Sequence, residues 1–375
     1  MSGIYIHIPF CKKACHYCNF HFSTSLRLKD DMIEAICKEI ELRKNYLSNK
    51  TLDSIYFGGG TPSLLKVMDL ERIFEAIHSV YAVREGAEIT LEANPDDINQ
   101  LSLDDFRKTG VNRLSIGIQS FFDTDLQWMN RAHSAIEAQN SVKLAQDAGY
   151  DNITIDLIYG APTTTDEMWR DNIDQALKLD VPHISAYCLT VEENTALHHF
   201  IAKNKTAPPQ QQKAVAQFDT LMKKLNDNGF LHYEISNFAK PGYLAVHNSN
   251  YWKGSHYIGI GPSAHSYDGA SRCWNISHNK KYIDALVDPD YKAETEYLSI
   301  AMKYNEYIMT SVRTMWGIDS DIVMTFGKEI QSYFLSEIRF LIEKEMISPE
   351  AKSYKLTQKG KHFADQVAMD LFFME

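Results

Sequence analysis

The chain has 375 residues, of which 44% are apolar and 23% charged, and no run of about eighteen apolar residues that would span a membrane, so we expect a soluble globular protein. A formal net charge of −11, without a compensating block of Lys and Arg, excludes nucleic acid as an expected partner. Six unevenly placed cysteines and an N-terminus without a basic or long apolar stretch predict a cytoplasmic protein with reduced thiols.

The first half of the chain alternates short β-rich runs with amphipathic segments, which is the pattern of βα units around a parallel sheet. We expect strands at Ile4–Ile8, Ser54–Phe57, Glu88–Glu92, Arg113–Ile118, Asn152–Leu157 and His183–Leu189. Apolar residues at helical spacing predict helices at Asp31–Tyr46, Asp69–Tyr81, Ser134–Ala148 and Asp166–Leu179. Six strands within about 190 residues indicate an α/β fold with an incomplete, TIM-type parallel barrel.

The second half of the chain changes character. Thr206–Pro209 has the composition of a linker, and Gln210–Asn228 after it has a helical period. Tyr, His, Asn and Gly are frequent from 231 to 268, which predicts loops and short strands. Helical patterns then return, and Ile347–Phe363 has the pattern of a winged helix, whose lysines are balanced by nearby Glu and Asp and so do not favour DNA binding. The expected segments are 1–230, 231–290 and 291–375.

Three cysteines, Cys11, Cys15 and Cys18, fall within eight residues directly after the first expected strand. A [4Fe–4S] cube normally takes four thiolates, so a loop with three leaves one iron open to another ligand. A zinc site that includes His16 or His21 is the main alternative, because Cys and His at short spacing also bind zinc. Buried cysteines on a helix face are a weaker alternative, since the loop is polar. Among the other cysteines, Cys188 is expected to face the barrel interior.

Four further stretches follow the cysteine loop or lead into it. They are Tyr-Ile-His-Ile-Pro-Phe-Cys at 5–11, Gly-Gly-Gly-Thr-Pro-Ser at 58–63, Ile-Gly-Ile-Gln-Ser-Phe at 116–121 and Asp-Leu-Ile-Tyr-Gly at 156–160. In this order, and over nearly the whole chain, they resemble the anaerobic coproporphyrinogen III dehydrogenase family of radical-SAM proteins. The resemblance implies a cluster on the three cysteines, with the amino and carboxylate groups of S-adenosylmethionine (SAM) on the open iron.

The same resemblance implies which residues contact SAM, of which some family members hold a second molecule. These positions are Tyr5, Gly59, Gly60, Thr61, Glu92, Gln119, Arg131 and Asp156. Glycines let backbone approach a ligand closely, Glu92 can accept hydrogen bonds from ribose or the ammonium group, and Arg131 can pair with a carboxylate. Each of these residues taken alone has a simpler explanation. The glycines also fit a plain turn, the carboxylates could cap helices, and the arginine could be a solvated surface group.

Two features depart from the oxidases of this family. The oxidases carry a fourth cysteine two positions after the third, where this chain has Phe20, and they have a longer segment ahead of the cysteine loop. The sequence His-Asn-Ser-Asn-Tyr-Trp at 247–252 resembles the HNxxYW motif of the heme chaperone branch, HemW. That branch implies His247 as a heme ligand, with Asn248, Tyr251 and Trp252 around the macrocycle. Without the resemblance, His247 is one of fourteen histidines and nothing singles it out.

We therefore predict a heme chaperone that binds heme, SAM and one [4Fe–4S] cluster, and delivers heme to an acceptor such as a membrane-bound respiratory hemoprotein. Segment 231–290 would bind heme and close the barrel, and 291–375 would be the family's C-terminal domain. The resemblance also implies flavodoxin or ferredoxin as electron donor, a homodimer on heme loading, and a cytoplasmic location with peripheral association to membranes. The alternative is an oxygen-independent coproporphyrinogen III dehydrogenase of porphyrin biosynthesis, so whether the chain is an enzyme stays open.

Overall fold

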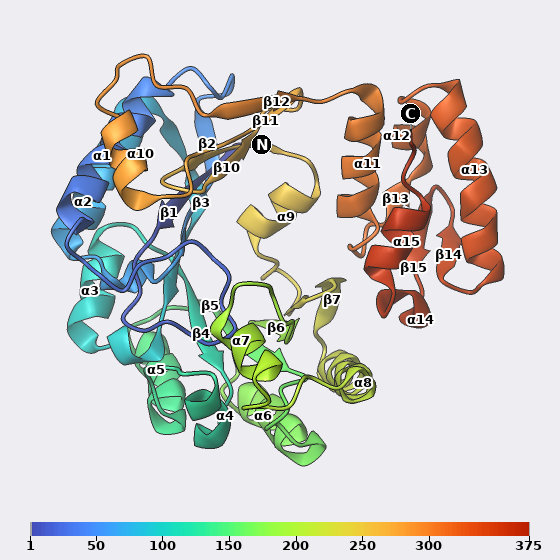
Figure 1. Ribbon diagram of the computed structural model, residues 1–375, viewed down its shortest axis with the longest axis horizontal. Helices are drawn as coiled ribbons and strands as arrows, with labels where there is room; N and C mark the ends of the chain where they lie inside the picture. The colour runs from blue at the N-terminus through green and yellow to red at the C-terminus, as the bar shows by residue number, and fades with distance from the viewer. Residues whose placement is uncertain (1, 375) are drawn as a thin grey trace.

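The computed structural model describes residues 2–374, which form a large open barrel and a smaller C-terminal unit beside it (Figure 1). Six parallel strands follow one another through the barrel sheet. They are β1 (Ser2–Ile8), β2 (Thr51–Gly59), β3 (Ala82–Ala93), β4 (Arg113–Gln119), β5 (Asn152–Tyr159) and β6 (His183–Cys188). All six expected strands are thereby confirmed, although β3 begins six residues before the predicted start at Glu88.

The barrel sheet has twelve strands in the order β12-β11-β10-β9-β1-β2-β3-β4-β5-β6-β8-β7. The strands that extend it are β7 (Leu231–Glu234), β8 (Asn237–Ala239), β9 (His256–Ile260), β10 (His265–Tyr267), β11 (Ser271–Trp274) and β12 (Glu294–Tyr297). Strand β9 pairs in parallel with β1, whereas the others pair antiparallel with their neighbours. Within the described residues β7 and β12 lie at opposite ends of the sheet, so the barrel is incomplete, as predicted.

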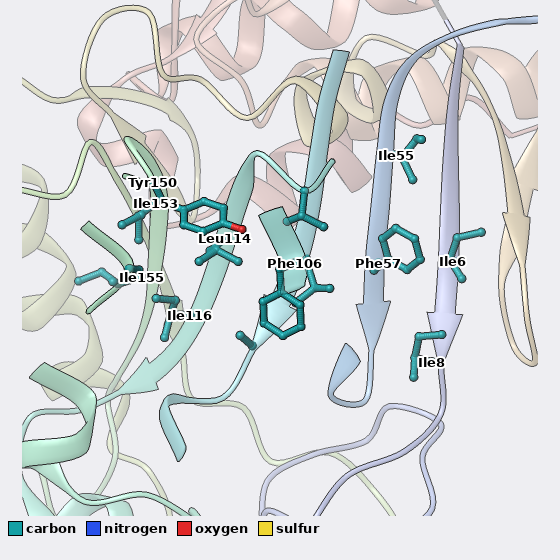
Figure 2. Close-up of a cluster of buried hydrophobic side chains, with 14 of the residues drawn as sticks. Ile6, Ile8, Ile55, Phe57, Phe106, Leu114, Ile116, Tyr150, Ile153 and Ile155 are labelled. Carbon is teal, nitrogen blue, oxygen red and sulfur yellow. The ribbon is translucent and has the colours of Figure 1, made fainter. Parts of the chain in front are cut away.

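Side chains alternate between two chemically different faces of the sheet. Apolar residues such as Ile6, Phe57 and Ile116 point outward and pack under the helices, as the close-up in Figure 2 shows. The intervening residues are polar and face the concave side, where Tyr56 meets Glu92 and Arg113 meets Thr154. The outer face therefore contributes apolar side chains to the core, and the concave face carries the polar side chains available to a ligand.

Most helices after the strands cover the outer face of the sheet, whereas α7 packs against the cysteine loop, where Leu197 N–H donates to His16 O (Figure 1). Their bounds are α1 (Lys29–Leu42), α2 (Val67–Val80), α3 (Gln100–Lys108), α4 (Asp123–Trp128), α5 (Ala135–Asp147), α6 (Asp166–Lys178), α7 (Ala196–Ala202), α8 (Gln211–Asp227) and α10 (Asn279–Ala285), with short 3₁₀ turns η1 (Pro62–Leu64) and η2 (Pro95–Asp97). The five helices expected in this part of the chain are confirmed.

One short helix, α9 (Val246–Trp252), lies where we expected loops and strands. Its sequence has no apolar period, and its first N–H groups are satisfied from a distant strand. The carboxylate of Glu88 on β3 accepts hydrogen bonds from the backbone N–H groups of Val246 and His247, both at 2.8 Å. A partner 158 positions earlier in the chain gives no local signal, so the helix could not be seen from the sequence.

The C-terminal unit has its own apolar core and its own small sheet. Its elements are α11 (Ile300–Ser311), β13 (Ile318–Asp319), α12 (Ser320–Met324), α13 (Lys328–Glu343), β14 (Ile347–Glu350), β15 (Ser353–Leu356), α14 (Gln358–Lys361) and α15 (Ala364–Asp370). The small hairpin between helices that the sequence suggested is present. Two backbone hydrogen bonds, Ile235 N–H to Arg313 O and Met315 N–H to Tyr233 O, tie the unit to the end of the barrel at β7. Across residues 2–374, we find no helix with the length and apolar character needed to cross a membrane.

Candidate functional site

The loop between β1 and α1 carries Cys11, Cys15 and Cys18, and all three line one cavity of about 420 Å³. The loop closes on itself through the backbone, because Cys11 N–H donates to Ser23 O at 3.0 Å. Lys12 ties the loop to the end of the next strands through ion pairs with two aspartates of η2. The sequence therefore places the three predicted cluster ligands at the carboxyl end of the barrel strands, where parallel barrels hold their active sites.

The three thiols belong to one electrostatic environment. Burial raises the pKa of Cys18 to about 11 and also raises that of Cys11, and the nearby cysteine thiolates raise both further. Binding metal must therefore displace protons from these thiols. Among residues 2–374 no three His, Cys, Asp or Glu side chains converge closely enough to hold one metal ion. A cube binds each cysteine through a different iron, so its ligands need not converge on one point.

The glycines after β2 are required by close backbone packing. A Cβ on Gly60 would lie 2.5 Å from the carbonyl oxygen of Phe10, and Gly59 has φ +105° and packs against the His7 ring. The N–H groups of this stretch are already used, since Gly59 donates to Glu92 Oε2, Gly60 to Ile8 O and Thr61 to Phe10 O. The predicted SAM contacts Gly59, Gly60 and Thr61 all line the cavity, where they can offer a ligand open space, carbonyl oxygens and the Thr61 hydroxyl.

Two buried carboxyl groups, Glu92 and Asp156, stand in the wall of the cavity that Arg131 also lines. Burial raises the pKa of Glu92 to about 7, with Asp156 adding to the rise, and burial raises the pKa of Asp156 to about 6. Tyr56 Oη donates to Glu92 at 2.8 Å, and Gly59 N–H donates at 3.2 Å. A positively charged ligand stabilises the ionised form of two buried carboxyls whose pKa values are raised. SAM carries two such charges, on its sulfonium and ammonium groups.

Arg131 links the cysteine loop to the strand ends. Its Nη1 lies 3.3 Å from Cys15 Sγ, and its Nη2 donates to Asn94 Oδ1 at 2.7 Å and to Gly117 O at 2.8 Å. Within the described residues its buried Nε has no hydrogen-bond partner. Gln119, which also lines the cavity, is buried and has a left-handed backbone with φ +68°. An unused buried donor beside a strand end with a left-handed residue suits a site for an acidic ligand group.

The structure also places residues in the cavity that the sequence did not single out. Asn94 directly follows β3, Ser115 lies within β4, Tyr17 comes from the cysteine loop and Tyr187 from β6. Their only sequence signal is a position in or next to an expected strand, or inside the loop. Cys188, which we expected to face the barrel interior, lines the same cavity.

Tyr5 lies beneath this cavity, outside its lining. Its Oη lies 3.0 Å from His7 Nδ1, and the other ring nitrogen of His7 lies 2.9 Å from the carbonyl oxygen of His21. The His7 ring thus joins the first strand to the end of the cysteine loop. Tyr5 is held by this contact, and its contact with SAM stays a prediction.

The four residues of the predicted heme motif divide between two places. His247 packs into the concave face, where its Nδ1 lies 2.9 Å from Ser54 Oγ and its ring is 5.1 Å from that of Tyr56. Burial, reinforced by Arg113, lowers its pKa to about 4, so the imidazole is neutral. Asn248, Tyr251 and Trp252 line a separate cavity of about 390 Å³ beside the C-terminal unit, and Tyr251 also lines the small cavity of His247.

Comparison with known proteins shows the family to which the chain belongs. The sequence matches the radical SAM superfamily over residues 5–176. It is 32% identical over 371 residues to the heme chaperone HemW of Bacillus subtilis, covering 98% of each chain. The chain belongs to the HemW family. It is also 31% identical to the heme chaperone HemW of Haemophilus influenzae, covering 100% of this chain and 98% of that one.

Among solved structures, the chain resembles the coproporphyrinogen III oxidase HemN of Escherichia coli with a TM-score of 0.85. The two are 22% identical, and the match covers 99% of this chain and 90% of that one. This likeness confirms the radical-SAM partial barrel and the smaller C-terminal unit as a fold. As a radical-SAM protein the chain binds a [4Fe–4S] cluster and SAM, and the cavity with three cysteines, two carboxyls and Arg131 fits both. The individual SAM and heme contacts stay predictions.

Proposed function

We propose that the protein is a heme chaperone that binds heme beside its cluster and SAM site and passes it to an acceptor hemoprotein. The observation that carries the proposal is a second cavity of about 390 Å³, lined by three of the four motif residues and distinct from the cavity of the cysteines. The relatives from Bacillus subtilis and Haemophilus influenzae, which match nearly the whole chain, are heme chaperones, and the motif is the part of this chain that the cluster chemistry does not use.

Bound on the three thiolates, a [4Fe–4S] cluster supplies an open iron for SAM and an electron. The residues of the chain bind and orient the ligand. Arg131 and the two buried carboxyls position charged groups of the ligand, and the burial of the cavity wall excludes water from them. A neutral His247 imidazole is in the protonation state that ligates iron.

In this conformation the ring of His247 is not accessible to a macrocycle. Besides its contacts with the sheet it lines a cavity of only about 10 Å³, which is room for one water molecule. Ligation of heme by His247 therefore requires α9 to move away from Ser54, and the two hydrogen bonds from Glu88 to the start of the helix must loosen or rotate with it.

The finer features of the proposal concern partners and location. We propose a membrane-bound respiratory hemoprotein as acceptor, flavodoxin or ferredoxin as the electron donor, and a homodimer in the heme-loaded state. We also propose that the protein works in the cytoplasm and meets its acceptor at the membrane surface. The absence of a basic block in the sequence favours contact through the acceptor over contact through anionic lipid.

The alternative function is oxidation of coproporphyrinogen III. Phe20 argues against it, because this residue occupies the position of the oxidases' fourth cysteine and its side chain is 68% exposed at the edge of the cluster cavity. One experiment separates the two functions. The anaerobically reconstituted protein is incubated with coproporphyrinogen III, SAM and a reductant, and in parallel is titrated with ferric heme.

We expect heme binding at about one equivalent and no protoporphyrinogen beyond the amount formed without protein. Efficient turnover to protoporphyrinogen would replace the chaperone with the oxidase. Absence of heme binding in a protein that holds its cluster would refute the proposal outright.

A further inference from the structure

The cavity beside the C-terminal unit joins three parts of the chain that are distant in sequence. It lies between the last barrel strands, α9 and the turn after α11, and in Figure 1 α9 stands between the barrel and the C-terminal unit. The lining residues that matter here are Asn248, Tyr251, Trp252, Tyr187, Glu234 and Arg313. Arg313 is the only cation among its lining residues, and no sequence motif pointed to it.

Arg313 stands over an aromatic ring with part of its guanidinium unused. Its Cζ lies 5.8 Å from the centre of the Trp252 ring, a cation–π distance. Its Nε is buried and, among residues 2–374, donates to no acceptor, because the nearest carboxylate oxygen, Glu234 Oε1, is 3.8 Å away. A planar cation with a free donor on an indole face can receive a carboxylate that belongs to a flat aromatic ligand.

The present partners of Arg313 are replaceable. Asp365 pairs with Nη1, but its side chain is 84% exposed, and such surface pairs contribute little. Glu234 is buried and has donors of its own, Asn237 Nδ2 at 2.6 Å and Ser236 N–H at 3.1 Å. Burial also raises the pKa of Glu234. An incoming carboxylate can therefore displace Asp365 without leaving a buried charge unpaired.

The cavity also lies next to the cluster site. Tyr187 lines both this cavity and the one that holds the cysteines. A neighbouring cavity of about 240 Å³ contains two more cations, but Lys355 pairs with Glu350 and Lys361 lies 3.0 Å from His232 Nδ1. The unused donor, the indole face and the contact with the motif residues coincide only at Arg313 within the described cavities.

We propose that Arg313 binds a propionate carboxylate of the porphyrin, whose ring edge rests on Trp252 in this cavity. This inference rests on the proposed heme-binding function and adds to it the residue that recognises the acidic edge of the macrocycle. Arg313 then acts as a switch between Asp365 on α15 and the ligand, so that heme loading releases the contact between the guanidinium and the C-terminal helix.

The test compares two ligands that differ only in the acidic groups. Full-length protein with its cluster is titrated with ferric heme and, in the same detergent buffer, with heme dimethyl ester, whose propionates are esterified. Arg313→Gln should weaken heme binding by about tenfold or more, the range of a charge-assisted hydrogen bond, and leave ester binding unchanged. Arg313→Lys should recover part of the heme affinity, and Asp365→Asn should leave it unchanged or raise it.

Arg339→Gln is the matched control, because Arg339 is an exposed arginine on α13. Unchanged heme affinity in Arg313→Gln would overturn the inference and leave the chaperone function standing. Equal weakening of heme and ester would also overturn it, since Arg313 would then act on the fold. If the wild-type protein with intact cluster binds neither ligand, the proposed function itself fails.

Discussion

The two ends of the barrel's concave face are prepared for their ligands in different ways. At the carboxyl ends of the strands, three cysteines, two carboxyls and Arg131 already surround one cavity. At the α9 end, the motif histidine is bonded to the sheet while its three neighbours face another cavity. The first site is preorganised, whereas the second must rearrange before its histidine can reach a ligand. The contrast suggests a constitutive cofactor at one end and a transferable cargo at the other.

The largest expected effect concerns the preorganised end. Replacement of Cys11, Cys15 or Cys18 by Ser should abolish the cluster, because each variant removes one of the three loop thiolates that hold it. Iron and sulfide content after anaerobic reconstitution measures this. Cys37→Ser is the control, since that thiol packs against the core under α1 and should leave the cluster intact. A full cluster in any of the three loop variants would break the assignment.

The next largest expected effect is on heme binding at the α9 end of the barrel, which must rearrange. His247→Ala should weaken ferric heme binding by roughly ten- to a hundredfold and remove the absorption signature of an axial histidine, if the imidazole ligates iron. His199→Ala on α7, where the side chain is exposed, should match the wild type. An unchanged spectrum and affinity in His247→Ala would show that this histidine serves only to hold α9 in the barrel.

A third prediction sharpens what the buried carboxyl does. Glu92→Gln should weaken SAM binding by about tenfold, while Glu85→Gln, an exposed carboxylate on the same strand, should not. The pKa of Glu92 is raised to about 7, so in the free protein the carboxyl gains a proton as the pH falls through 7. A cationic ligand prefers the ionised form, so SAM affinity should fall below pH 7 in the wild type.

In Glu92→Gln that dependence on pH should be flatter. Isothermal titration at several pH values, under anaerobic conditions, gives both the affinity and its slope. A wild-type affinity that is constant between pH 6 and 8 would contradict the role given to Glu92.

The smallest expected effect concerns the hydrogen bond between Ser54 and His247, which keeps the histidine on the sheet. Ser54→Ala removes the 2.9 Å contact with His247 Nδ1 and should raise heme affinity by about three- to tenfold, the net value of one hydrogen bond. Ser79→Ala on α2, an exposed serine, is the control. A fall in heme affinity in Ser54→Ala would mean that Ser54 orients the imidazole for ligation, and that the site is preorganised after all.

Much of the preorganised end could be predicted from the sequence, because its residues are local to strand ends. Periodicity located the six strands, and the resemblance to a known family named Gly59, Glu92, Gln119 and Asp156. Because parallel strands bring their carboxyl ends to one edge, these residues lie near the cysteine loop. The division of the heme motif could not be predicted. It depends on Glu88 and Ser54, which bond to α9 from strands about 160 and 190 positions away.

Arg313 was equally invisible in the sequence, where it stands in the turn after α11. Its role follows from the packing of the C-terminal unit against β7, which sets the guanidinium over Trp252. Long-range contacts of this kind have no pattern in the chain, so only the assembled fold brings the arginine to the motif.

The central claim is that the three-thiolate cluster keeps one iron open for SAM while a second site takes heme. The most direct test is electron paramagnetic resonance of the reduced, reconstituted protein before and after addition of SAM. We predict that SAM alters the cluster signal and that heme bound beforehand does not prevent the change. A fully loaded cluster whose signal is indifferent to SAM would contradict the account.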